Sequence, residues 1–216
     1  MSLALLHTSP VHVPVFDALR DADHPGLDLR HLVRQDLLDR AGVLGPEAVE
    51  GDVEAVVTGA VADGATAVLC TCSTIGGVAE AVGARLGVPV LRVDRPMAAA
   101  AVRAGRVTVL AALHATLEPT GALLAQEAER AGERAGERAF EVRSVLVDGA
   151  WERFETGDHD GYLDLVAAAV DAVTEADVIV LAQASMAGAV TRTATRIPVL
   201  SSPRPGLDAA AAAAAR

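Results

Sequence analysis

Short apolar runs alternate with amphipathic helical patterns along the whole chain, and the alternation starts again near residue 107. The first run covers residues 3–6, and a polar loop and a helix that Pro14 can begin follow it. Residues 107–113 are likewise followed by a polar loop and a helix that begins at Pro119. Such alternation indicates βαβ units, in which right-handed crossovers join parallel strands. The sequence therefore predicts an α/β fold with an internal repeat.

The repeat predicts two pseudo-symmetric lobes, each a parallel sheet flanked by helices. We expect residues 1–96 to form the first lobe, completed by residues 197–216, and residues 97–196 to form the second. Ligands bind beyond the carboxyl ends of parallel strands, so two such lobes would have their active-site cleft between them. We expect strands at residues 3–6, 27–33, 67–70, 88–93, 107–113, 140–147, 178–181 and 199–200, with helices at 35–40, 46–62, 73–86, 97–103, 162–173 and 187–195, and from 14, 119 and 207.

The composition excludes several classes of function. Of the 216 residues, 51% are hydrophobic and 2% aromatic, so Val, Leu and Ala must fill the core. All 18 basic residues are arginines, which excludes Schiff-base chemistry at a lysine and a Walker phosphate-binding lysine. A net charge of −11 argues against nucleic acid or an anionic membrane as partner. Two cysteines, one residue apart, provide neither a disulfide framework nor a zinc site.

Targeting and cofactor signals are also missing from the sequence. No basic start precedes a long apolar segment, and no apolar run reaches the roughly 18 residues of a membrane span. We therefore expect a cytoplasmic protein with no membrane partner. No Gly-x-Gly-x-x-Gly pattern follows the first predicted strand, which disfavours dinucleotide binding. We expect neither a metal nor a cofactor.

Cys72 lies where a predicted buried strand, residues 67–70, passes into a helix that Ser73 and Thr74 are expected to begin. Unpaired amides and the macrodipole at a helix N-terminus stabilise negative charge, and they lower a cysteine pKa from about 8.5 toward about 7 or below. The same amides can hold a substrate carboxylate. We interpret Cys72 as a reactive thiol and Cys70 as a small core residue.

These features resemble the cofactor-independent aspartate/glutamate/hydantoin racemase superfamily, which also contains arylmalonate decarboxylases and maleate isomerases. The resemblance rests on the repeated lobes, on Cys72-Ser73-Thr74 after an apolar strand and on residues 178–187, and it covers nearly the whole chain. It implies one cysteine on each lobe, on opposite faces of a carbon next to a carboxylate or carbonyl. One thiolate would remove a proton and the other thiol would return one. Family members also commonly form homodimers or higher homo-oligomers.

The second cysteine of the resemblance is absent from this chain. Cys72 occupies the first position, and a shift of 111 residues places Gln183 at the second. A glutamine amide cannot exchange a proton near neutral pH. The family's glutamate racemases carry Asp-Ser where this chain has His7-Thr8, and Cys-Thr-His where it has Gln183-Ala184-Ser185.

We expect His7 to serve as the second acid/base, because it ends the strand next to the one that bears Cys72. An imidazole with a pKa of about 6.5 suits proton transfer near pH 7. The alternative is a histidine that only caps the end of its strand. The substrate would be a small carboxylate-bearing molecule, and the predicted substrate-binding residues are Thr8, Ser9, Ser73, Thr74, Thr116, Gln183, Ala184 and Ser185.

Three functions stay open at this point. The first is a racemase-superfamily enzyme that transfers a proton at the carbon next to a carboxylate or carbonyl, with Cys72 as main acid/base. The second is a one-cysteine decarboxylase, lyase or isomerase, since such a step needs one acid/base. The third is a small-acid binding protein that lost the second catalytic cysteine at Gln183.

Overall fold

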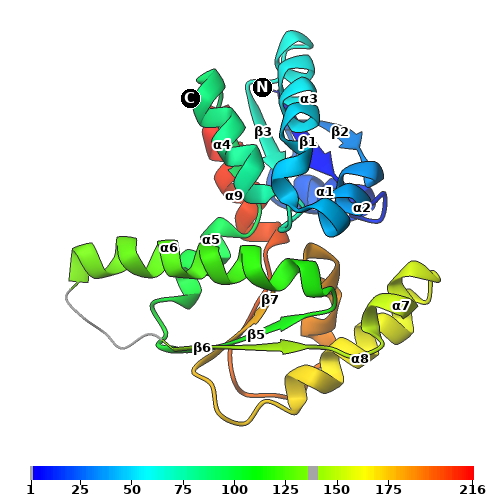
Figure 1. Cartoon of the computed structure of the whole chain (residues 1–216), viewed down its shortest axis with the longest axis vertical. Helices are drawn as coiled ribbons and strands as arrows, with labels where there is room; N and C mark the ends of the chain where they lie inside the picture. Colours follow the sequence, from blue (N-terminus) through cyan, green and yellow to red (C-terminus); the bar gives the residue numbers. More distant parts are fainter. Residues whose placement is uncertain (1, 136–140) are drawn as a thin grey trace. The chain divides into compact units, whose positions relative to one another are not determined.

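The computed structural model describes residues 2–135 and 141–216, with side chains omitted from the description at 133–135 (Figure 1). The chain divides into two compact units. Unit 1 is Met1–Arg95 with Pro203–Arg216, and unit 2 is Pro96–Ser202. Each unit contains one sheet of four parallel strands with helices on it, which confirms the predicted α/β class. The expected cleft between the lobes stays a prediction.

The sheet of unit 1 has the order β2-β1-β3-β4. Its strands are β1 (Ser2–His7), β2 (Asp28–Val33), β3 (Ala67–Cys70) and β4 (Val90–Arg92). The central strands are apolar from Leu3 to Leu6 in β1 and throughout β3, and these residues are buried on both faces, as parallel strands between helical layers must be. One face packs on α2 (Gln35–Leu44), η1 (Pro46–Val49), α3 (Glu50–Ala62) and α4 (Gly76–Leu86), and the other on α1 (His12–Asp23) and α9 (Pro203–Ala214).

Unit 2 repeats this arrangement with the strand order β6-β5-β7-β8. Its strands are β5 (Arg106–Ala111), β6 (Glu141–Leu146), β7 (Val178–Leu181) and β8 (Val199–Leu200). One face packs on α5 (Arg95–Ala101) and α6 (Leu117–Ala135), and the other on α7 (Ala150–Glu155), α8 (His159–Asp171) and η3 (Ala184–Arg192). A short 3-10 helix, η2 (His114–Thr116), joins β5 to α6.

The two sheets share the same register between their central strands. Leu3 pairs with Ala67 in unit 1, and Val107 pairs with Val178 in unit 2. Counting from these pairs, a residue just after β1 corresponds to the residue 104 positions later in the sequence, just after β5. A residue just after β3 likewise corresponds to the residue 111 positions later, just after β7. Cys72 and Gln183 therefore follow equivalent strands at equivalent positions, as the sequence repeat predicts.

Several boundaries differ from the predicted ones. The helix expected at 187–195 is the 3-10 helix η3, which begins soon after β7, and α7 was not predicted. Residues 197–202 lie in unit 2, because β8 pairs with β7 there, and the chain returns to unit 1 only at Pro203. The expected start of β6 at Phe140 lies outside the described residues.

The C-terminal helix α9 completes unit 1. It packs on β1, β3, β4 and α1 through an alanine-rich face that includes Leu207, Ala210 and Ala213. Two prolines in its first turn suit the start of a helix, where a missing N–H costs no hydrogen bond. Among the residues that the structure describes, no helix is both long and apolar enough to cross a membrane.

Candidate functional site

The loops that follow β1 and β3 lie at one edge of the unit 1 sheet. These strands are neighbours, with Leu6 paired to Cys70, and the carboxyl ends of parallel neighbours meet at the same edge. Five of the six predicted residues here are buried and one is half-buried. They are His7, Thr8, Cys72, Ser73 and Thr74, with Ser9 half-buried.

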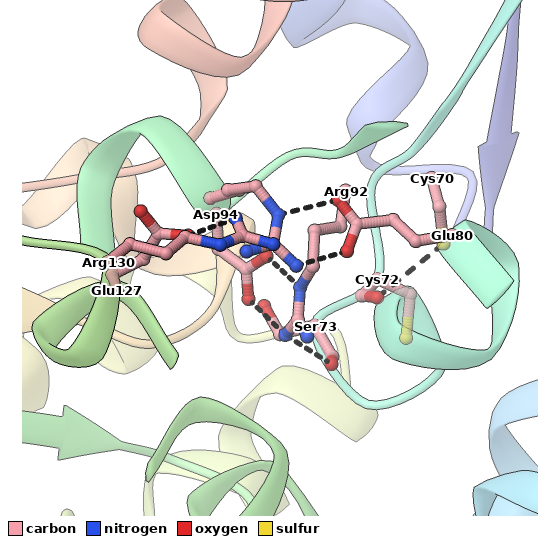
Figure 2. Close-up of polar contacts among 9 residues, drawn as sticks. Cys70, Cys72, Ser73, Glu80, Arg92, Asp94, Glu127 and Arg130 are labelled. Atoms are coloured by element: carbon pink, nitrogen blue, oxygen red, sulfur yellow. Dashed lines mark hydrogen bonds and ion pairs between the residues drawn. The ribbon is translucent and has the colours of Figure 1, made fainter. Parts of the chain in front are cut away.

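The two cysteines lie on the same face of β3 and its extension, as their spacing of two residues requires. Cys70 is fully buried, and its thiol donates to the carbonyl oxygen of Cys72 at 3.6 Å (Figure 2). Burial, with repulsion from Cys72 as a second cause, raises the pKa of Cys70. Cys72 retains 8% exposure, and both thiols are free. The more accessible thiol is therefore that of Cys72.

The helix after Cys72 begins later than predicted. Residues 73–75 form a turn, and α4 begins at Gly76 with Ile75 at its N-cap. Cys72 thus precedes the first helical residue by four positions, and Ser73 and Thr74 belong to the turn between them. The sequence pattern missed this turn because two small polar residues fit a turn as well as a helix start.

A buried ion pair fastens this turn to β4. The guanidinium of Arg92 donates to both carboxylate oxygens of Asp94, at 2.7 and 2.9 Å, and to the carbonyl oxygen of Ser73 at 3.3 Å (Figure 2). Arg92 is 3% exposed and Asp94 is fully buried. The Arg92 side chain also lies against the first turn of α4, where a Cβ on Gly76 would come within 3.0 Å of its Cβ and 3.1 Å of its Nε. The chain segment just after Cys72 is therefore held by a charged group.

His7 lies in a chain of hydrogen bonds that joins β1, β2, α1 and the loop after β3. Its Nδ1 lies 2.7 Å from Thr71 Oγ1, which donates to the carbonyl oxygen of Leu6 at 3.2 Å. Its Nε2 lies 2.8 Å from His31 Nδ1, and His31 Nε2 lies 3.3 Å from Asp17 Oδ1. The Leu6 carbonyl and the Asp17 carboxylate can only accept, so Thr71 donates to the first and His31 Nε2 to the second. Because Thr71 has only one hydroxyl proton, its oxygen accepts from His7 Nδ1. Both ring nitrogens of His7 are thereby engaged.

The surroundings of His7 differ from those that the sequence suggested. Burial, with repulsion from His12 and His31, lowers its pKa to about 3, so the imidazole is neutral at pH 7. Its ring packs 5.6 Å from that of Phe16, on the sheet face that faces α1. Cys72 packs on the opposite face, among residues of α3 and α4. The expectation of an ordinary histidine pKa beside Cys72 is therefore corrected, because alternate strand positions point to opposite faces.

The predicted residues of unit 2 follow β5 and β7, which are also neighbours. Gln183 is half-buried, and its Oε1 accepts from the backbone amides of Ala112, at 2.6 Å, and Leu113, at 3.2 Å. Ala184 and Thr116 are buried. The hydroxyl of Ser185 lies 2.8 Å from that of Tyr162, and burial raises the pKa of this tyrosine. Gln183 and Ser185 are therefore already engaged by unit 2 itself.

Sequence reasoning missed several polar residues at these strand ends. Arg92 and Asp94 carried one signal, which is a pair of opposite charges at the end of an otherwise apolar run. Thr71 carried no signal, since a single polar residue after an apolar run rarely reveals its partner. Among the described residues, no three His, Cys, Asp or Glu side chains are grouped so that they could hold a metal ion.

Comparison with known proteins finds solved structures that have a similar fold. No protein-family model and no curated protein matches the sequence. Solved structures do match: glutamate racemase from Thermus thermophilus, in complex with β-chloro-D-alanine, is 18% identical with a TM-score of 0.74, over 99% of this chain and 80% of that one. Aspartate racemase from Picrophilus torridus is 12% identical with a TM-score of 0.67, over 99% and 94% of the two chains.

A mutant of arylmalonate decarboxylase in a sulfate-associated form is also similar. It is 20% identical with a TM-score of 0.62, over 100% of this chain and 94% of that one. Racemases and a decarboxylase thus share this succession of two four-stranded parallel sheets. The chain has the fold of these two racemases and of this decarboxylase.

Proposed function

We propose that this chain is a cofactor-independent, racemase-like enzyme that transfers a proton at the carbon next to the carboxylate of a small acid, with Cys72 as its acid/base. The position of Cys72 supports this proposal above all. Cys72, which retains 8% exposure, follows β3 at the carboxyl end of a parallel sheet, where ligands of such sheets bind, and Ser73 and Thr74 come directly after it. The fold shared with glutamate and aspartate racemases supports the same reaction class.

In the proposed step the Cys72 side chain acts first as a base and then as an acid. The Cys72 thiolate takes the proton from the carbon next to the carboxylate, and the C–H electron pair passes into an enolate. The thiol then returns a proton to the same carbon and becomes a thiolate again. A single acid/base that acts on one face exchanges the proton with retention of configuration.

Decarboxylation is the second candidate, and Gln183 favours it. Its side chain cannot exchange a proton near neutral pH, so a reaction that needs one acid suits the chain. In that step the bond to a carboxylate breaks, CO₂ leaves, and the electron pair stays on the carbon as an enolate. The Cys72 thiol then protonates this carbon.

Proton exchange in deuterated water tests the proposal. Small 2-substituted acids are incubated with the protein, and loss of the α-proton signal and release of CO₂ are followed. We expect turnover of at least one acid, and we expect Cys72→Ser to slow it by at least about 100-fold, as loss of an acid/base does. Cys70→Ala is the matched control and should retain turnover. Binding of acids without exchange or CO₂ release would instead indicate a binding protein.

A further inference from the structure

The strand β6 forms one edge of the unit 2 sheet, because within the described ranges it pairs with β5 alone (Figure 1). The amide of Glu141 donates to the carbonyl oxygen of Gly105, and the amide of Val147 donates to that of Ala111. In a parallel strand the N–H and C=O of one residue point to the same side, and those of the next residue point to the other side. The odd-numbered residues of β6 therefore bond to β5, and the even-numbered residues direct their backbone groups outward.

The outward-directed residues are Val142, Ser144 and Leu146, and all three are exposed. Alternate side chains share one face of a sheet, so these three side chains also lie on the same face. Val142 retains 40% exposure and Leu146 retains 38%. Among the described residues, neither belongs to an apolar cluster of unit 2. The same three residues thus present unpaired edge groups of the sheet and an exposed apolar face.

The equivalent edge strand of unit 1, β2, is covered to a greater extent. The residues of β2 at these three positions are Leu29, His31 and Val33. Leu29 packs on the core that includes α1 and α9, and His31 Nε2 lies 3.3 Å from Asp17 of α1. One copy of the repeat therefore covers this face with its own helices, whereas β6 leaves it open.

We propose that β6 is a docking edge for a second copy of this chain, whose own β6 pairs with it in the antiparallel direction about a two-fold axis at Ser144. In this register Ser144 faces Ser144 of the second copy, and Val142 faces Leu146. Each facing pair exchanges both of its N–H to O hydrogen bonds, because these residues direct both groups outward. The inference goes beyond the proposed function and does not depend on it.

The order of side chains on β6 is self-complementary, as a two-fold contact requires. The outward face is apolar, small and apolar in either direction, so each valine meets a leucine. A register centred on Arg143 would place two guanidinium groups opposite each other, which is destabilising. A register centred on Val145 would place Val142 opposite Asp148, which lies beyond the end of β6. In the register centred on Ser144, Arg143 faces Val145 and no charge lies opposite another.

Self-association of the full chain tests this proposal. Sedimentation equilibrium from about 1 µM to about 1 mM covers the range of weak complexes, and we expect an equilibrium between monomer and dimer. Ser144→Pro should weaken dimerisation by at least about tenfold, because proline removes an outward N–H that β5 does not use. Ser144→Ala is the matched control, since alanine keeps this N–H and should leave the dissociation constant unchanged.

Amide hydrogen exchange at low and high protein concentration tests the register. We expect exchange at Val142, Ser144 and Leu146 to slow as the fraction of dimer rises, because their amides then bond to the second copy. The amides of Arg143 and Val145 should exchange at the same slow rate at both concentrations, since they bond to β5. NMR spectra recorded after transfer into deuterated water measure these rates residue by residue.

Several outcomes would contradict the inference. A chain that stays monomeric up to about 1 mM would overturn it and would leave the edge for a strand of another protein. A dimer that Ser144→Pro leaves intact would overturn it as well, and so would exchange at Ser144 that ignores protein concentration. If the proline variant does not fold, Val142→Glu replaces it. This variant places a charge against Leu146 of the second copy, and its side chain is exposed in the single chain.

Discussion

Arg92 and Asp94 form a two-point ion pair inside unit 1, with nitrogen to oxygen distances of 2.7 and 2.9 Å. Arg92 ends β4, whereas Asp94 lies in the following turn, and a third bond runs from Arg92 to the carbonyl oxygen of Ser73. Two charges withdrawn from water need each other, because a single buried charge is strongly unfavourable. Arg92, held by Asp94, thus fixes the loop that contains Cys72, although Arg92 itself need not contact a substrate.

Removing one partner of this pair should destabilise unit 1 strongly. Asp94→Ala leaves the Arg92 guanidinium buried without its counter-charge, and we expect the free energy of unfolding to fall by about 3–5 kcal/mol in urea. Glu54→Ala is the control, since it removes a half-exposed carboxylate from the surface pair with Arg85 and should change little. An unchanged urea midpoint in Asp94→Ala would show that the ion pair makes no net contribution to the stability of unit 1.

Much of the fold could be predicted because it follows from local patterns. The short apolar run at residues 67–70, preceded by Asp63-Gly64, favours a strand buried on both faces, and alternation with helices indicates a parallel sheet. The position of Cys72 after that strand followed directly. The start of α4 at Gly76 did not, because capping preferences place a helix end only within a few residues.

The partners of the site residues could not be predicted, because they are far apart in the sequence. His7 meets His31 across 24 residues, and Gln183 meets Ala112 across 71. Which side chains touch depends on strand register and on loop geometry, and the sequence pattern determines neither. For the same reason the sequence could not show that His7 is neutral and fully engaged.

Alkylation should distinguish the two cysteines. We expect iodoacetamide to label Cys72 well before Cys70, because Cys70 has no exposed surface and burial raises its pKa. Tandem mass spectrometry of the labelled peptide identifies the modified sulfur, and Cys72→Ser should abolish most of the labelling of the native protein. Earlier labelling of Cys70 would reverse the assignment of the reactive thiol.

Stability should fall as the pH drops below about 6.5, the ordinary histidine value. Burial lowers the pKa of His7 to about 3 and that of His12 to about 4, so these two side chains become protonated in the unfolded chain at a pH where they stay neutral in the folded chain. Each histidine then lowers the free energy of unfolding by roughly 1.4 kcal/mol for each pH unit below about 6.5, and this decrease ends only near the pKa of the folded state. Urea unfolding between pH 7 and pH 5 measures this slope.

Single substitutions identify the histidines that cause the slope. His12→Gln should reduce the dependence between pH 7 and pH 5 by about half, since His7 and His12 contribute similarly in that range. His159→Gln changes an exposed histidine and should leave the slope as it is. A slope that survives the loss of His12 unchanged would contradict the assignment.

The direction of the hydrogen bonds around His7 is also testable. Because Thr71 donates to the Leu6 carbonyl, we expect His7 to carry its proton on Nδ1 and not on Nε2. Long-range ¹H–¹⁵N NMR spectra of the imidazole distinguish the two tautomers at pH 7. Thr71→Val should remove the preference, whereas a proton found on Nε2 in the unmodified chain would reverse the direction of the whole chain of bonds.

Two glycine substitutions in unit 1 should change stability in opposite directions. A Cβ on Gly206 of α9 would lie 2.5 Å from the backbone oxygen of Val93 and 2.9 Å from its Cα, and backbone atoms cannot rotate away. We expect Gly206→Ala to lower the free energy of unfolding by about 1–3 kcal/mol, as overpacking does. A Cβ on Gly59 within α3 would meet nothing within 4 Å, so Gly59→Ala should raise stability by about 0.5–1 kcal/mol, because alanine loses less entropy in a helix. Urea unfolding measures the stability of both variants, and a Gly206→Ala protein as stable as the parent would mean that α9 is not held closely against Val93, which follows β4.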